Sequence, residues 1–151
     1  MKFDRWIYGF LWFCAATLAT TGLLKLISVF GQAPILETAD PLLGIKVRFV
    51  LLISGLVEVI IATALCLLRN PRSALWLVSW MGFNFLLYRS FRTLDGEDNP
   101  CPCLGTVLSW LQLNPTLFDG SLWAMSAFMF LGGSLLLWKM QNQPVAPRIP
   151  A

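Results

Sequence analysis

Two cysteines, Cys101 and Cys103, are the side chains of this protein whose types and spacing best suit covalent chemistry. A Cys-x-Cys pair can close only a small, strained disulfide ring, and strain makes a disulfide easier to reduce and therefore more oxidising. Pro102 lies between them and limits how far the thiols can separate. This spacing favours thiol–disulfide exchange, in which one cysteine forms a mixed disulfide with a partner and its neighbour resolves it.

Two other uses of Cys101 and Cys103 remain open, a static structural disulfide and half of a metal site. A zinc site needs further ligands, usually cysteine or histidine. The chain has no histidine, and Cys14 and Cys66 are expected at the opposite face of the membrane, where they act as small apolar residues. We therefore predict no metal site, and we favour a redox-active pair over an inert bridge.

The composition indicates an integral membrane protein. Of the 151 residues, 57% are hydrophobic and only 13% are charged, and the mean hydropathy is +0.69. A soluble domain of this length needs more polar surface than that. The net charge of +3 is small and its cations are scattered along the chain. This argues against nucleic-acid binding and makes the lipid bilayer the first expected partner.

The apolar runs predict four transmembrane helices. A helix needs about 20 mostly apolar residues to cross the hydrocarbon core, and the runs that approach or exceed this length are 6–30, 47–68, 74–89 and 122–138. The third helix can extend through Arg92, and Asp119 or Ser121 can cap the fourth. Residues 105–113 are too few to span and predict a segment at the membrane interface.

The predicted fold is therefore all-α, an integral membrane bundle of four transmembrane helices with a short interfacial segment between helices 3 and 4. The bundle forms one domain over residues 1–140, and residues 141–151, rich in proline, form a disordered cytoplasmic tail. In the loop between the first two helices, Glu37 and Asp40 are expected to stay in water.

The basic residues predict the orientation of the bundle. Cytoplasmic loops of membrane proteins carry an excess of lysine and arginine. An inside N-terminus places six cations on the cytoplasmic side, and the opposite side then has four cations with nearly all the acids: Lys2, Arg5, Arg69, Arg72, Lys139 and Arg148 against Lys46, Arg48, Arg89 and Arg92. Both termini are thus expected in the cytoplasm. In a bacterium, Cys101 and Cys103 would face the periplasm, where thiols can be oxidised.

Ionisable residues within the spans form the second candidate site. Such residues are costly in lipid, usually face the bundle interior and often have a function. Lys25 and Glu58 differ in depth by only several Å at about 1.5 Å per residue, so we predict that they pair, with Arg89 as a further member. For Arg89 alone, a place among the lipid headgroups is the favoured interpretation. Small residues nearby, including Gly22 and Gly55, predict close helix packing.

Four short motifs occur in a characteristic order. They are Gly-Leu-Leu-Lys-Leu at 22–26, Asp-Pro at 40–41, Gly-Leu-Val-Glu at 55–58 and Cys-Pro-Cys-Leu-Gly at 101–105. Together they resemble the MauE branch of the MauE/DoxX-like family of four-helix membrane proteins over residues 6–138. The resemblance implies a role in periplasmic thiol redox. MauE-type proteins are associated with maturation of methylamine dehydrogenase alongside a thioredoxin-like partner, and DoxX-type proteins with membrane redox complexes.

These observations predict a membrane-embedded thiol–disulfide redox protein, or the membrane subunit of such a system, in the bacterial inner membrane. Cys101 and Cys103 would exchange disulfides with a periplasmic thioredoxin-like partner or client protein. A quinone is the candidate electron acceptor, in a pocket shaped by Lys25, Glu58 and Arg89. The alternative is a non-catalytic anchor or assembly subunit of a respiratory or maturation complex with a structural disulfide. Homo- or hetero-oligomers fit either role.

Overall fold

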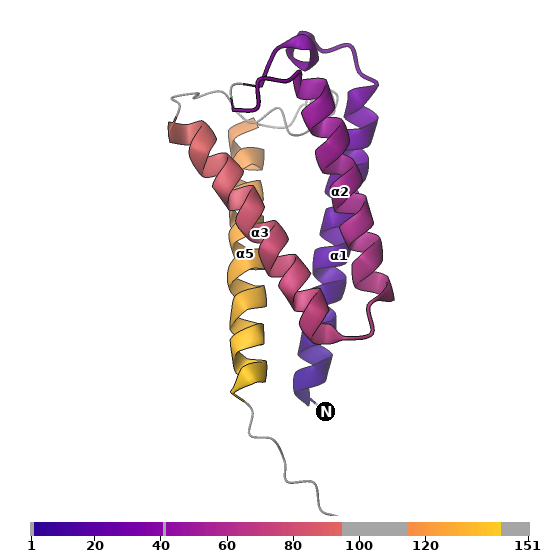
Figure 1. Ribbon diagram of the computed structural model, residues 1–151, viewed down its shortest axis with the longest axis vertical. Helices are drawn as coiled ribbons and strands as arrows, with labels where there is room; N and C mark the ends of the chain where they lie inside the picture. Colours follow the sequence, from indigo (N-terminus) through magenta and orange to yellow (C-terminus); the bar gives the residue numbers. More distant parts are fainter. Residues whose placement is uncertain (1, 41, 95–114, 143–151) are drawn as a thin grey trace, which may run out of the picture.

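The computed structural model describes residues 2–40, 42–94 and 115–142. These residues form four long helices, one short 3-10 helix and no strand (Figure 1). The elements are α1 (Lys2–Val29), η1 (Pro34–Glu37), α2 (Val47–Leu67), α3 (Pro71–Leu94) and α5 (Pro115–Gln141). The all-α prediction is thus confirmed for this part of the chain. The predicted interfacial segment 105–113, the pair Cys101 and Cys103, and residues 143–151 of the predicted tail lie outside the described residues.

Three of the long helices are apolar enough to cross a membrane. The candidate spans are Arg5–Val29, Val47–Leu67 and Gly120–Gln141. With 24 residues, α3 is long enough, at about 36 Å, to do the same. It is more polar, however, because it carries Arg72, Asn84, Arg89 and Arg92 among its residues. Three membrane-spanning helices are therefore supported, and the fourth crossing stays a prediction.

The bounds of α1 and α2 agree closely with the predicted runs, and α3 continues past Arg92 to Leu94, as the sequence allowed. The start predicted for the last helix is wrong. This helix begins at Pro115, before the expected caps Asp119 and Ser121. Proline suits the first turn of a helix because its missing N–H would have no partner there and its φ is already helical.

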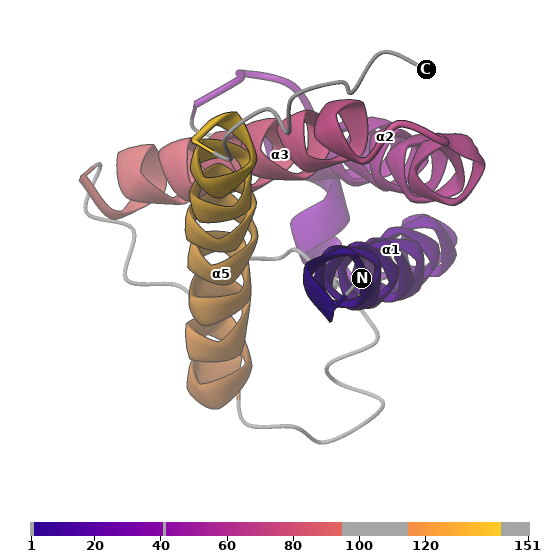
Figure 2. The ribbon, with the colours of Figure 1, turned by 90° about the horizontal axis from the view of Figure 1, so that it is seen from below.

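The four helices pack as two pairs. Helix α1 lies along α2, and α3 lies along α5, whereas the two pairs meet over a much smaller area. Viewed from below, α1 and α2 lie on one side, α5 lies on the other, and α3 runs from one side toward the other (Figure 2). In Figure 1, α3 starts beside α2 at the end that holds the N-terminus and diverges from it toward the opposite end.

Glycines allow the close approach within each pair. A Cβ atom placed on Gly22 would lie 3.0 Å from the carbonyl oxygen of Gly55, and the reverse substitution gives the same distance. This confirms the predicted close packing of α1 on α2. In the other pair, a Cβ atom on Gly82 would lie 2.6 Å from the backbone nitrogen of Phe130 and 2.9 Å from the carbonyl oxygen of Ser126. Each pair therefore crosses backbone against backbone.

The two cysteines in the described part of the chain have different surroundings. Cys14 is fully buried in the apolar core at the N-terminal end of the bundle, where it packs as the small apolar residue that the sequence predicts. Cys66 is exposed on the candidate membrane span α2, so it is not part of the protein core. The difference arises because Cys66 lies on the side of α2 that faces away from the other helices.

We expect Gly82→Ala to destabilise the protein by about 1–3 kcal/mol, the usual cost of forcing extra atoms into a packed contact. The new methyl group would meet the backbone of α5, which cannot move aside as a flexible side chain can. Unfolding of the purified protein in detergent would measure this. Gly120→Ala is the matched control, since no atom lies within 4 Å of a Cβ placed there. Equal stability of the two variants would contradict the close crossing.

Candidate functional site

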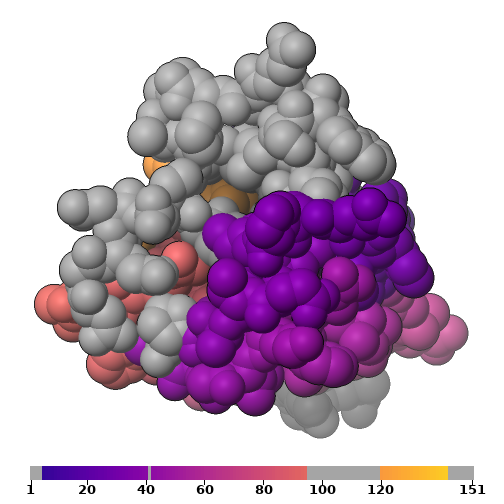
Figure 3. Space-filling view, turned by 90° about the horizontal axis from the view of Figure 1, so that it is seen from above, coloured from indigo at the N-terminus to yellow at the C-terminus, as the bar shows by residue number. Residues whose placement is uncertain are grey.

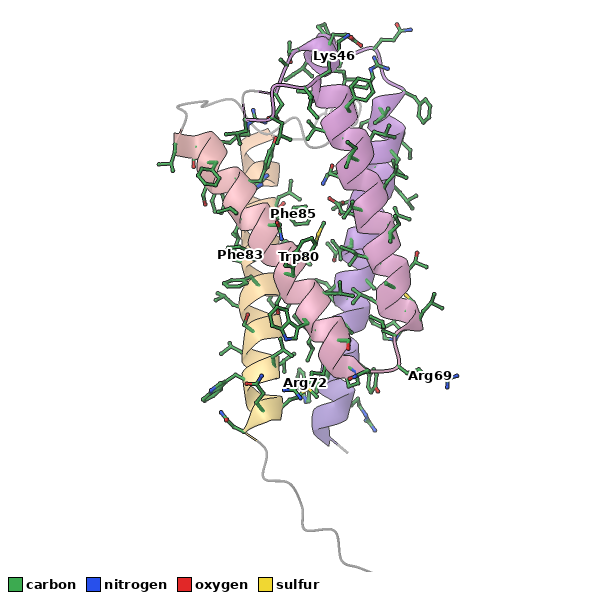
Figure 4. The ribbon with its side chains drawn as sticks, viewed as in Figure 1. Lys46, Arg69, Arg72, Trp80, Phe83 and Phe85 are labelled. Atoms are coloured by element: carbon green, nitrogen blue, oxygen red, sulfur yellow. The ribbon has the colours of Figure 1, made fainter. Side chains whose placement is uncertain are left out.

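A cavity of about 400 Å³ lies between the two helix pairs. Its walls come from α1, α2, α3, α5 and the connection between α1 and α2, and most of them are apolar. On α3, Trp80 and Phe85 line the cavity, whereas the Phe83 ring packs against Phe130 with ring centroids 5.7 Å apart (Figure 4). Polar side chains gather within this apolar wall, and they include Thr21, Lys25, Asp40, Glu58, Asn84, Tyr88 and Arg89.

A buried ion pair forms the inner wall of the cavity. The Lys25 ammonium pairs with Oε1 of Glu58, and the Thr21 hydroxyl donates a hydrogen bond of 2.8 Å to Oε2 of the same carboxylate. Glu58 is completely buried. The Lys25 nitrogen also lies 5.0 Å from the centroid of the Phe85 ring, a distance at which the ring face attracts a cation. The ion pair predicted from helix depth is therefore present.

The glycine crossing of α1 and α2 positions this ion pair. Thr21 and Lys25 are four residues apart on α1, so they share one face of that helix. A Cβ atom on Gly22 would lie 3.0 Å from the Cβ atom of Glu58. The carboxylate of Glu58 thus leaves α2 close to the α1 backbone, between the hydroxyl and the ammonium group. Without side chains at Gly22 and Gly55, both oxygens of the carboxylate can find partners on α1.

Arg89 lies in the same cavity, not among the lipid headgroups as the sequence favoured. It is only 6% exposed, and its guanidinium carbon lies 5.8 Å from the Trp123 ring centroid on α5. Its aromatic partner comes from α5, which is far away in the sequence, so the residues of α3 alone do not identify that partner. The three residues predicted to form a polar pocket therefore do line one cavity. Their role in binding a cofactor stays a prediction.

A second buried carboxylate, Asp40, joins the α1–α2 connection to α3. Its Oδ1 atom accepts hydrogen bonds from the backbone N–H groups of Leu42 and Leu43, at 3.0 and 3.1 Å. Its Oδ2 atom accepts a hydrogen bond of 2.6 Å from the Tyr88 hydroxyl, which also has Arg92 as a hydrogen-bonding neighbour. Asp40 is 1% exposed, so the prediction that it stays in water is wrong. Aspartate before a turn commonly accepts a hydrogen bond from the backbone N–H two residues on. This tendency is the sequence signal that could have predicted the backbone hydrogen bond of Asp40.

Exposed ion pairs hold the rest of the α1–α2 connection. Figure 3 shows residues of this connection spread over the end of α1 and α2. Glu37 pairs with Lys46 at 2.8 Å and with Arg48 at 3.0 Å. The hydrogen bond and charge of Lys46 lower the pKa of Glu37 below its ordinary value. The ion pair therefore contributes to stability at pH values above the ordinary pKa of glutamate. This contribution is lost as the pH falls through the lowered pKa of Glu37. Arg48 also donates a 2.9 Å hydrogen bond to the carbonyl oxygen of Val29.

Three comparisons with known proteins bear on the family of this chain. The family model for methylamine utilisation protein MauE matches residues 4–138, a range that holds all the helices almost in full. No curated protein and no solved structure matches the chain. Among the described residues, no three histidine, cysteine, aspartate or glutamate side chains come together as metal ligands would.

We expect Lys25→Met to destabilise the protein by about 3–5 kcal/mol, because it leaves the buried Glu58 carboxylate without its cation. Combining Lys25→Met with Glu58→Gln should restore much of this loss, since no uncompensated charge then remains. Unfolding of each variant in lipid–detergent mixtures provides the comparison. Lys46→Met is the control, because it breaks an exposed ion pair, which adds little to stability. A double variant no more stable than Lys25→Met would contradict this view of the ion pair.

We expect Tyr88→Phe to loosen the α1–α2 connection, because Asp40 then loses a hydrogen bond to a buried, charged acceptor, worth about 1.5–3 kcal/mol. Hydrogen exchange would report this at the backbone amides of Asp40, Gly44 and Val47, which bond within the connection. Tyr8→Phe is the control, since Tyr8 lies half-exposed on α1. Unchanged exchange rates in Tyr88→Phe would show that the hydrogen bond does not hold the connection.

Proposed function

This chain belongs to the MauE family of multi-pass membrane proteins, and we propose that it is a thiol–disulfide redox subunit of the bacterial cytoplasmic membrane. The observation that carries the proposal is the cavity, which combines apolar walls with the buried Lys25–Glu58 pair. The matched range also includes Cys101 and Cys103. A chain with one exchangeable thiol pair and one internal polar pocket has the parts that electron transfer from thiols to a small acceptor needs.

The proposed reaction begins at the cysteine pair. A thiolate of a periplasmic thioredoxin-like partner attacks the Cys101–Cys103 disulfide and forms a mixed disulfide, which releases the other cysteine as a thiolate. The second thiol of the partner then attacks the mixed disulfide. The partner leaves as a disulfide, and Cys101 and Cys103 hold two electrons and two protons as thiols. The strain of a Cys-x-Cys disulfide favours its reduction in this direction.

The direction of the helices supports a periplasmic place for this reaction. Arg69 and Arg72 lie at the same end of the bundle as the N-terminus, and Lys46 lies at the opposite end (Figures 1 and 4). Helix α3 ends and α5 begins at the Lys46 end (Figure 1). We propose that α3 is the fourth crossing and that the Arg69 end is cytoplasmic, as the basic residues favour. The chain then carries Cys101 and Cys103 between α3 and α5 on the periplasmic side.

The cavity has the chemistry to hold a quinone as the electron acceptor. Its volume falls within the usual range for small-molecule sites, about 300–1,000 Å³, and it has the expected mixture of apolar walls and a few polar groups. Lys25 could donate a hydrogen bond to a quinone oxygen, and Trp80 and Phe85 could pack against the ring. When bound, a quinone would supply the acceptor for two electrons and two protons. A role only as an anchor would not require a cavity, or a costly buried charge pair on its wall.

Replacing Cys101 and Cys103 together by serine should leave periplasmic client proteins more reduced, because the chain then has no disulfide to exchange. Thiol trapping of the clients in intact cells would measure this. Cys66→Ser is the matched control, since Cys66 is an exposed free cysteine on α2. An unchanged redox state in every client would overturn the proposal and favour an anchor or assembly subunit.

A further inference from the structure

We infer that the cavity opens sideways into the bilayer between α2 and α3, and that Ile53 and Trp80 select a ligand with an apolar tail. The headgroup of the ligand lies against the Lys25–Glu58 pair, and its tail leaves the protein between Ile53 and Trp80. This rests on the proposed function in taking a quinone as the ligand and α3 as the fourth membrane crossing.

The mouth of the cavity is defined by residues that both line it and remain exposed. A side chain that meets both conditions lies at the opening, since one side faces the cavity and the other faces the surroundings. Leu43, Ile45, Ile53 and Trp80 are cavity-lining residues with exposures of 55%, 42%, 55% and 51%. All four are apolar. Leu43 and Ile45 belong to the α1–α2 connection, whereas Ile53 and Trp80 lie on the helices α2 and α3. The part of the rim that Ile53 and Trp80 form faces hydrocarbon at far lower cost than it faces water.

The Lys25–Glu58 pair lies at the buried side of the cavity, and Asp40, Asn84, Tyr88 and Arg89 supply further polar groups elsewhere in its lining. Glu58 is fully buried, Lys25 is 9% exposed, and both oxygens of Glu58 have partners on α1. From the Lys25–Glu58 pair to Ile53 and Trp80 at the mouth, the lining changes from charged to apolar. That gradient matches an amphiphile, which has a hydrogen-bonding head and a hydrocarbon tail. A uniformly polar solute would leave the mouth unused, and a plain hydrocarbon would leave the ion pair without a ligand contact.

The helix arrangement explains why the opening is on this side. Helices α2 and α3 are joined by a short turn and touch over little of their length. They diverge toward the Lys46 end (Figure 1), where the hydrogen bond between Tyr88 and Asp40 connects α3 to the α1–α2 connection. This hydrogen bond crosses between the helix pairs at that end. In the part of the chain that the structure describes, no such hydrogen bond crosses the space between Ile53 on α2 and Trp80 on α3.

The cavity is too small to hold the whole of a tailed quinone. A volume of about 400 Å³ lies near the lower limit for a drug-sized ligand. It can hold a substituted quinone ring and the first part of its side chain, but not a long isoprenoid or alkyl tail. A tailed quinone therefore fits only with its tail in the bilayer. Ile53 and Trp80 then contact the tail where it leaves the protein.

The test compares two quinones with one headgroup, decylubiquinone and the tail-less ubiquinone ring, on the full chain in lipid nanodiscs. Binding is measured by equilibrium separation, with empty nanodiscs as the reference for partitioning into lipid. In Ile53→Trp the larger side chain narrows the mouth. We expect the Kd for decylubiquinone to rise about tenfold, or about 1.4 kcal/mol, with the Kd for the ring much less affected. Ile60→Trp is the matched control, because Ile60 is an exposed isoleucine on α2 outside the cavity lining.

Several results would overturn the inference. These are an unchanged Kd in Ile53→Trp, an equal loss for both quinones, an equal effect of Ile60→Trp, or wild-type protein that binds neither quinone. A phospholipid that occupies the cavity and is not displaced by quinone would do so as well. If Ile53→Trp does not fold, Ile53→Phe narrows the same opening. It is expected to raise the Kd for decylubiquinone more than the Kd for the tail-less ring.

The cysteine variants separate this inference from the proposed redox role. Protein with both Cys101→Ser and Cys103→Ser should bind decylubiquinone as the wild type does, since serine is close to cysteine in size and the variant keeps the Lys25–Glu58 pair, Ile53 and Trp80. Tail-dependent quinone binding, together with an unchanged redox state of the client proteins, would support the lateral site and reject thiol exchange. A changed redox state of the client proteins, in the absence of quinone binding, would support thiol exchange and reject the lateral site.

Discussion

A carboxylate in the middle of a membrane helix must be compensated inside the protein, and in this chain Glu58 sets that constraint. It is fully buried on α2, where a lone charge would be very costly. Lys25 neutralises it and Thr21 bonds its second oxygen, and both come from α1. The two helices can come this close only because Gly22 and Gly55 have no side chains at their crossing. The ion pair and the glycine contact therefore depend on each other.

The cavity follows from how the remaining helices are arranged around that first pair. Helices α3 and α5 make their own close crossing at Gly82, so each pair is tightly packed within itself. No comparable contact draws α2 against α3, and the larger side chains Trp80 and Phe85 lie on the side of α3 that lines the cavity. The space left between the pairs is therefore part of the architecture. Its charged wall comes from α1 and α2, and its aromatic wall comes from α3.

Much of this arrangement was predictable from residues that act locally. The apolar runs determine α1 and α2, and the depths of Lys25 and Glu58 along them were enough to predict their ion pair. What the sequence did not reveal depends on partners far away in the chain. Asp40 is buried because Tyr88 reaches it from α3, and Arg89 is buried where α5 supplies Trp123. Neither partner can be identified from a single helix or loop, since spacing along one element says nothing about which other element will lie beside it.

The self-sufficiency of the α1–α2 pair has a consequence for biosynthesis. A chain is made from its N-terminus, and early units generally fold before later ones are complete. Glu58 has both its cation and its hydroxyl partner on α1, so its charge is compensated as soon as α2 has emerged. Lys25 and Glu58 can then enter lipid as a neutral ion pair, before α3 and α5 pack against the first two helices. The order of the helices along the chain thus spares the growing protein an exposed charge in the membrane.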